Sequence, residues 1–194
     1  MQRIKVLAVL STAWAFVVLS ADASAQTAEF VTEDGLAKDT QAYASNMGVS
    51  IDEAIRRFKL QDLAGELETD LSANYPETFA GLWLEHKPKF RIVASFTRHG
   101  QVSVAPYISS NSDLEGMIEV RSAVKSLAML QKEQTQAVNA IRHAGIRADL
   151  GINVRENRVE LKIAERNNFD MAVTRGDVQL PPDIKIITVP GLVR

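Results

Sequence analysis

The stretch Gly81-Leu-Trp-Leu-Glu85, followed after a turn by Arg91-Ile-Val-Ala-Ser-Phe-Thr97, predicts a β-hairpin, because Leu82 and Leu84 before the turn and Ile92, Ala94 and Phe96 after it occupy every second position. A second hairpin is predicted where Gly151-Ile-Asn-Val-Arg155 is followed by Arg158-Val-Glu-Leu-Lys-Ile-Ala164. A segment with helical spacing precedes each hairpin. The chain therefore looks like one folding module written twice, and repeats of this kind build scaffolds and interaction surfaces.

The helix of the first module is predicted to begin after Ser50. Ser50 and Glu53 have the spacing of a capping box, in which the serine oxygen accepts from the Glu53 amide and the Glu53 carboxylate reaches back. Apolar residues that lie mostly three or four positions apart continue the helix: Ile51, Ile55, Phe58, Leu63, Leu67 and Leu71. The helix is expected to end before Tyr75-Pro76.

The remaining elements follow from turn and spacing signals. In residues 100 to 113, β-branched residues favour a strand, whereas Pro106 and the Ser/Asn cluster favour a loop, so both stay open. Further elements are expected as a strand over 117–120, a helix from Ser126 to the cap Gly145, a turn at Glu156-Asn157, a short helix over 168–174 and a strand over 184–189. The prediction is an α+β fold in which helix, hairpin, connector and strand occur twice, with small antiparallel sheets packed on helices.

The first residues have the pattern of a secretory signal peptide: Arg3 and Lys5, an apolar run over residues 6–20, and the cleavage site Ala23-Ser24-Ala25. The alternative is a membrane anchor, but 15 residues are too few because a spanning helix needs about 20. We expect a signal peptide over residues 1–25, a flexible leader over 26–46, a first module over 47–121, and a second module with a C-terminal tail over 122–194.

Composition narrows the environment and the partners. Removing residues 1–25 leaves 20 basic and 23 acidic residues, a formal charge of −3, which favours neither nucleic acid nor an anionic membrane as partner. Cysteine is absent, which excludes disulfides and thiol nucleophiles. Asn-x-Ser/Thr acceptors are absent too, so a bacterial periplasm or extracellular space fits better than a eukaryotic secretory route.

No cluster of residues predicts an enzyme, a metal site or a cofactor. The three histidines share no metal-ligand spacing: His143 suits the end of a helix, and His86 and His99 are interpreted as solvated. A Gly-x-Ser-x-Gly elbow is missing. Paired carboxylates are interpreted as surface groups, Arg175-Gly176-Asp177 as a turn, and three aromatic residues as core; the residues concerned are Glu66 with Asp70, Glu156 with Glu160, and Trp83, Phe90 and Phe96.

Three motifs in order resemble the prodomain of alpha-lytic protease and streptogrisin-type serine proteases. They are Met47-Gly-Val-Ser-Ile-Asp-Glu-Ala-Ile-Arg-Arg-Phe58, Thr78-Phe-Ala-Gly-Leu-Trp-Leu84 and Gly151-Ile-Asn-Val-Arg-Glu-Asn-Arg-Val-Glu-Leu161, within a match over residues 43–192. The family has a helix after the first hairpin, where this chain has the Pro106 stretch.

The resemblance implies an exported folding helper that packs beside a chymotrypsin-like serine protease, assists its folding and then inhibits it. The prodomain tail lies in the active-site cleft, and here that tail is 189–194, with Leu192, Val193 and Arg194 as the expected partner contacts. The family's protease domain is expected about where this sequence stops. A periplasmic interaction or ligand-binding module, or a non-functional remnant of a proenzyme, therefore remains an alternative.

Overall fold

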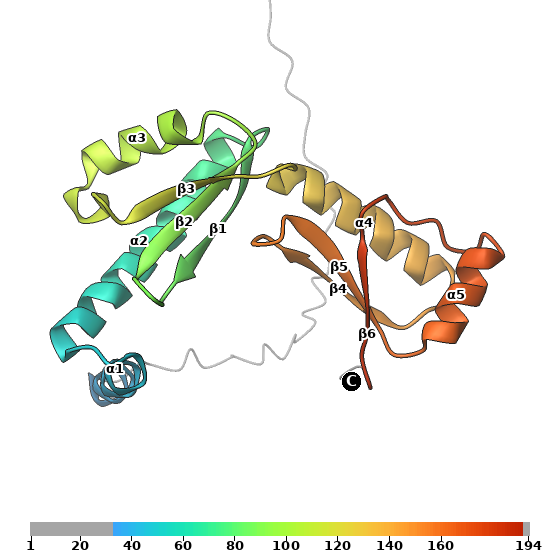
Figure 1. Ribbon diagram of the computed structural model, residues 1–194, viewed down its shortest axis with the longest axis horizontal. Coiled ribbons are helices and arrows are strands. Elements are labelled where there is room, and N and C mark those ends of the chain that lie inside the picture. Colours follow the sequence, from blue (N-terminus) through green and yellow to red (C-terminus); the bar gives the residue numbers. More distant parts are fainter. Residues whose placement is uncertain (1–32, 192–194) are drawn as a thin grey trace, which may run out of the picture.

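The structure is a computed structural model that describes residues 33 to 191, and its fold is α+β, as predicted (Figure 1). The first module contains α1 (Glu33–Met47), α2 (Ile51–Asn74), β1 (Phe79–Glu85), β2 (Arg91–Phe96), α3 (Gly100–Ser110), a 3-10 turn (Ser112–Leu114) and β3 (Ile118–Ser122). The second contains α4 (Leu127–His143), β4 (Ala148–Asn153), β5 (Arg158–Ile163), α5 (Arg166–Thr174) and β6 (Lys185–Thr188).

Both modules have the same topology. Strands β1, β2 and β3 form one three-stranded sheet, and β4, β5 and β6 form the other. In each sheet the first two strands are antiparallel and the third runs parallel to the second. Even the bond after the last strand recurs, because Ala123 N donates to Phe96 O and Val189 N donates to Ile163 O, both at 2.9 Å. The third strand is thus parallel, although the sequence suggested antiparallel sheets.

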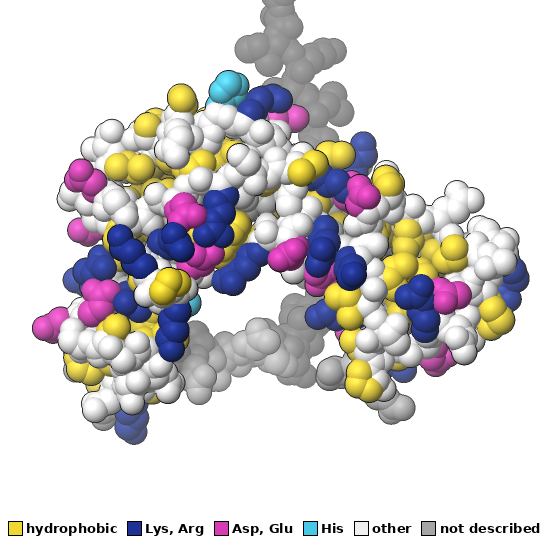
Figure 2. All heavy atoms as spheres, in the orientation of Figure 1, with side chains coloured by type: hydrophobic (Ala, Val, Ile, Leu, Met, Phe, Trp, Pro, Cys, Tyr) yellow, Lys and Arg dark blue, Asp and Glu magenta, His cyan; other side chains and the backbone are white. Residues whose placement is uncertain are grey.

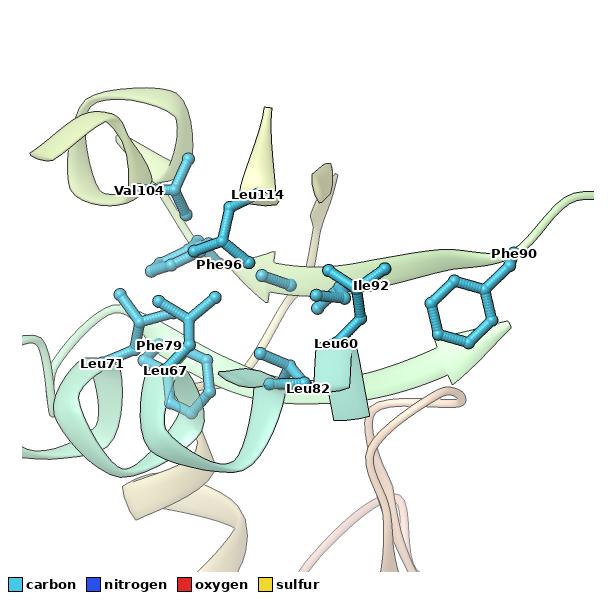
Figure 3. Close-up of a cluster of buried hydrophobic side chains, with 12 residues drawn as sticks. Leu60, Leu67, Leu71, Phe79, Leu82, Phe90, Ile92, Phe96, Val104 and Leu114 are labelled. Carbon is cyan, nitrogen blue, oxygen red and sulfur yellow. The ribbon is translucent and has the colours of Figure 1, made fainter. Parts of the chain in front are cut away.

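The core of the first module lies between α2 and one face of its sheet (Figure 3). The rings of Phe79 and Phe96 meet edge to face with their centroids 5.5 Å apart. Each fully buried side chain of this size contributes about 1.5–3 kcal/mol. The buried set includes Leu60, Leu67, Leu71, Phe79, Phe90, Ile92, Phe96 and Val104. Phe90 and Phe96 therefore belong to the core, as predicted.

The second module has a smaller core. Its buried residues come from α4, β5, α5 and the chain after α5: Ile141, Leu161, Ile163, Phe169, Ala172 and Val178. Ser126 caps α4 by accepting from Met129 N at 3.2 Å, and Gly145 follows the helix with φ +67°. Both ends of this helix match the sequence prediction.

Residues 100–110, which the sequence left open between strand and loop, form helix α3. A side chain on Gly100 would place its Cβ 2.5 Å from Val120 Cγ1, so only glycine allows this helix to approach β3 so closely. Val104 is 1% exposed. Packing on the sheet therefore outweighs the backbone hydrogen bond that Pro106 cannot make inside the helix. The first module therefore does have a helix after its hairpin. The expectation that the Pro106 stretch replaces the helix found at this place in the prodomains it resembles was wrong.

Helix α1 covers most of the stretch that was expected to be a flexible leader, residues 26–46. Thr40 and Ala44 are each only 5% exposed, and the Tyr43 ring lies 5.1 Å from that of Phe58 on α2. The leader prediction was therefore wrong for residues 33–46. The prediction relied on the small, polar composition and weak apolar periodicity of this stretch. Tertiary contacts with α2, which such a pattern does not show, hold the helix.

Only half of the predicted capping box at α2 is present. Ser50 Oγ accepts from Glu53 N at 3.2 Å, as expected. The Glu53 carboxylate does not reach back, because it pairs instead with Arg56 and Arg57 at 2.8 and 2.7 Å. The arginines lie one turn along the helix and compete for the carboxylate.

Several sequence predictions lie outside the described residues. These are the signal peptide over residues 1–25, the start of the leader, and the contact residues Leu192, Val193 and Arg194. Within residues 33–191, none of the helices has the length and apolar composition needed to cross a membrane.

Candidate partner-binding site

The C-terminal segment leaves the second sheet from an edge. Strand β6 pairs with β5, and among the described residues no strand pairs with its other side. After the bond from Val189 N to Ile163 O, Pro190 and Gly191 are exposed. The described chain thus ends in two exposed residues that directly follow an edge strand. An extended segment of this kind can pair with a strand of another protein through backbone hydrogen bonds.

A groove of about 610 Å³ lies in the second module, between α5 and the chain that leads into β6. Phe169, Val173, Val178 and Leu180 contribute apolar walls. Arg166 and Asp170, ion-paired at 2.9 Å, stand on the same groove. An apolar surface with charged residues beside it is typical of protein contact sites.

The turn of hairpin two joins the modules (Figure 1). Asn157 Oδ1 accepts from Val124 N at 3.0 Å and Lys125 N at 2.7 Å, and Asn157 Nδ2 donates to Lys125 O at 2.8 Å. Lys125 also pairs with the buried Glu133 of α4 at 2.9 Å. The linker between the modules, residues 123–126, is therefore fixed to the second module by hydrogen bonds of its backbone and by the ion pair of the Lys125 side chain.

The same turn touches strand β1. Arg155 donates to Leu84 O at 2.9 Å, and its guanidinium lies 6.0 Å from the centre of the Trp83 ring. Gly81 has φ +132°, and a Cβ there would come 2.8 Å from the side chain of Val154. We call the contacts of residues 154–157 with β1 and the linker the module junction.

Charged side chains gather over the first sheet, on the face away from its helices (Figure 2). Glu85 and Glu119 are each paired with both Arg91 and Arg121, which closes a four-membered ion-pair ring across β1, β2 and β3. The hydrogen bond that Glu85 accepts from Arg121 is the largest of the influences that lower the pKa of Glu85 to about 2. Trp83 lies on this face, with the centre of its ring 5.6 Å from the Arg121 guanidinium carbon, and it is only partly buried. The prediction that Trp83 belongs to the core was therefore wrong.

The three histidines have separate structural roles. His143 lies in the last turn of α4 with Nδ1 2.7 Å from Asn139 O, where the sequence placed it. His99 is exposed and precedes α3 with φ 58°. His86 was interpreted as solvated, which is wrong: it is half-buried, and its Nδ1 lies 2.8 Å from the Tyr43 hydroxyl.

The other candidate residues occupy surfaces. Glu66 and Asp70 are exposed on α2, and Arg158 stands between Glu156 and Glu160 at 3.8 and 3.5 Å. Asp177 binds the Arg175 side chain at 2.9 Å across Gly176, which has φ +79°, as expected for a turn. In residues 33–191, no three His, Asp or Glu side chains are grouped so that they could hold a metal ion.

Sequence reasoning missed the residues that form the module junction. Asn157 was recognised only as a turn residue, since asparagine tolerates left-handed backbone. Its partners lie more than 30 residues away, so no local pattern points to them. In comparisons with known proteins, no family model and no curated protein matches this chain.

Proposed function

We propose that this protein is an exported, prodomain-like and non-enzymatic protein that binds a chymotrypsin-like serine protease as a folding chaperone or inhibitor. The observation that carries the proposal is the C-terminal segment, which leaves the open edge of β6 beyond Val189. An extended chain of this kind can enter the cleft of a protease and form backbone hydrogen bonds with a strand of the enzyme. The helix and hairpin motifs occur in the same order as in the protease prodomains that they resemble, and this resemblance gives the class of partner.

The joined modules support this function further. Asn157, Arg155 and Val154 hold the second module against the first, so the surfaces offered to a partner are organised before binding. Preorganisation lowers the entropy cost of association. A chaperone or inhibitor that stabilises one arrangement of its partner benefits from such a frame.

The test is a titration of chymotrypsin-like proteases with the chain that begins at Gln26. We expect inhibition that saturates at one chain per enzyme, and faster recovery of activity when the denatured protease refolds with the chain present. Deleting Leu192, Val193 and Arg194 should weaken inhibition at least tenfold, because buried contact residues dominate binding energy. An Asn168→Ala variant, changed on the surface of α5, serves as the control and should inhibit normally.

Absence of both effects across a panel of such enzymes would refute the proposal. Capture of a partner that is not a protease from the native organism would favour the alternative of a periplasmic interaction module. Unchanged inhibition after the tail deletion would remove the C-terminal segment from the binding site.

A further inference from the structure

Strand β3 forms one edge of the first sheet, and among residues 33–191 no strand pairs with its outer side. The opposite edge, β1, instead touches hairpin two through the bond from Arg155 to Leu84 O. A hollow of about 370 Å³ lies beside β3, and its lining includes residues 116–120 and Gln101 of α3. An unpaired edge offers backbone donors and acceptors to a strand of another chain. The edge at β3 thus has both the space and the backbone groups for a further strand.

The hydrogen bonds between β2 and β3 show which backbone groups of β3 point outward. Met117 O accepts from Ile92 N, and Ala123 N donates to Phe96 O, both at 2.9 Å. Because the backbone groups of successive residues in a strand point to alternate sides, the odd-numbered residues of β3 face β2. The even-numbered residues direct their N–H and C=O groups away from the sheet: Ile118, Val120 and Ser122.

The side chains of β3 carry opposite charges two residues apart. Glu119 and Arg121 both belong to the ion-pair ring, and about a third of each side chain is exposed, 34% and 37%. These charges gather on the face of the first sheet that Figure 2 shows. The side chains of Ile118 and Val120 pack against the first core on the other face. Charge and apolar surface are therefore separated onto the two faces of this strand.

The charges favour one way of pairing this edge with a copy of itself. In an antiparallel pair of two β3 strands centred on Val120, Glu119 of each copy lies directly opposite Arg121 of the other. Moving the centre by one residue places Glu119 opposite Glu119, or Arg121 opposite Arg121, and like charges directly opposite are destabilising. The register centred on Val120 also pairs the outward backbone groups, Val120 with Val120 and Ile118 with Ser122.

We propose that two copies of this chain associate through β3, in an antiparallel pair centred on Val120. The pair joins two three-stranded sheets into one continuous sheet, and it uses the same patch of each copy about a two-fold axis. The ion-pair rings of the two copies are then linked across the axis. The C-terminal segment takes no part in this contact, so the dimer does not depend on the proposed function.

The equivalent edge in the second module lacks these charges. Strand β6 has the sequence Lys185-Ile-Ile-Thr188, which holds no acidic residue to lie opposite its lysine. Self-pairing is therefore expected at β3 and not at β6. A contact between two strands of five residues is small, so the dimer should be weak. The chain from Gln26 should be mostly dimeric at about 1 mM and monomeric at about 1 µM.

Sedimentation equilibrium across this concentration range, combined with charge reversal, tests the register. Glu119→Arg alone, or Arg121→Glu alone, places two like pairs across the axis, and association should fall about tenfold or more. An equimolar mixture of the two variants has opposite charges at both pairs again, so the mixture should dimerise as the wild type does. The changes within each chain are the same alone and in the mixture, so only a contact between chains explains such a recovery.

A second pair of variants leaves the ion-pair ring intact. Ser122→Pro removes an outward N–H group, whereas the bond from Ala123 N to β2 remains, so association should be lost without loss of the fold. Thr188→Pro is the matched control, because Thr188 is the exposed last residue of β6 and also precedes a residue bonded to its neighbouring strand. This control should dimerise normally. Circular dichroism checks the fold of each variant.

Three results would overturn the proposal. The first is a chain that stays monomeric at about 1 mM. The second is a mixture of folded Glu119→Arg and Arg121→Glu variants that fails to dimerise, and the third is association that survives Ser122→Pro. If the chain is monomeric and Ser122→Pro weakens protease inhibition, this edge binds the protease instead of a second copy. Enzyme titrations near 1 µM examine the monomer, so a failure there leaves the dimer untouched.

Discussion

Asn157 combines a left-handed backbone, φ 50°, with three hydrogen bonds to the linker. Asn157→Ala should lower the free energy of unfolding by about 2 kcal/mol, because two amides and one carbonyl lose their partner. Urea unfolding measures the change. Asn157→Gly loses the same hydrogen bonds but relaxes the backbone, and it should cost less. A value for Asn157→Ala within about 0.5 kcal/mol of the wild type would contradict the role of this side chain.

Ser50 provides a second test at the residue scale. Ser50→Ala should cost about 1 kcal/mol, because the Glu53 amide loses its capping acceptor. Thermal or urea unfolding gives the value, with Ser109→Ala on the exposed surface of α3 as the control. Equal stability of the two variants would show that the cap contributes nothing.

The residue scale also shows the limits of sequence patterns. The Ser50 cap was predictable because its partner is three residues away. The pairing of Glu53 with Arg56 and Arg57 could have been suspected from helical spacing, but the choice between competing partners depends on side-chain geometry. The contact between Tyr43 and His86 spans 43 residues and gives no local signal.

At the scale of elements, the ion-pair ring links the three strands of the first sheet. The Glu85 pKa of about 2 lies below the ordinary value of 4.5, so its contribution to stability is present above about pH 4.5 and is lost as the pH falls toward 2. Glu85→Gln should therefore be less stable than the wild type near neutral pH, and the difference should vanish near pH 2. Acid unfolding followed by circular dichroism measures this convergence.

Glu66→Gln is the matched control for the ring, because Glu66 is an exposed carboxylate on α2. Its stability should follow the wild type at every pH. A constant offset between Glu85→Gln and the wild type down to pH 2 would mean that packing, rather than charge, explains the effect of that substitution.

Both hairpins and the helices α2 and α4 could be predicted because their periodic patterns and caps are local. Helix α3 could not, since its sequence contains Pro106 and β-branched residues that disfavour a helix. The close approach of Gly100 to Val120 and the burial of Val104 decide its structure, and both depend on a strand that comes later in the chain. Helix α1 escaped prediction for a similar reason.

At the scale of the whole molecule, we expect the two modules to unfold together on heating, because the module junction joins them. Gly81→Ala introduces a Cβ 2.8 Å from the Val154 side chain at a backbone angle that favours glycine, so it should lower the melting temperature and separate the unfolding of the modules. Calorimetry detects the split. In β4, Gly151→Ala adds its Cβ to open space and should leave a single transition. Identical melting curves for the two variants would contradict the junction.

The repeat of the module was visible in the sequence, whereas its assembly was not. Each hairpin carries its own alternation, but the contacts that join the modules involve Arg155 with Leu84 and Asn157 with Lys125, which no periodicity connects. The prediction that residues 192–194 contact a partner rests on family resemblance alone. The structure adds that the described chain ends in the exposed Pro190 and Gly191 after the edge strand β6.

The most direct test of the proposed function is sedimentation of the chain from Gln26 with catalytically inactivated chymotrypsin-like proteases, which cannot cleave the C-terminal segment. We expect a one-to-one complex with at least one enzyme of the panel. Deleting Leu192, Val193 and Arg194 should shift this mixture toward free components. Free components with every enzyme, before any deletion, would contradict the claim that this protein binds such a protease.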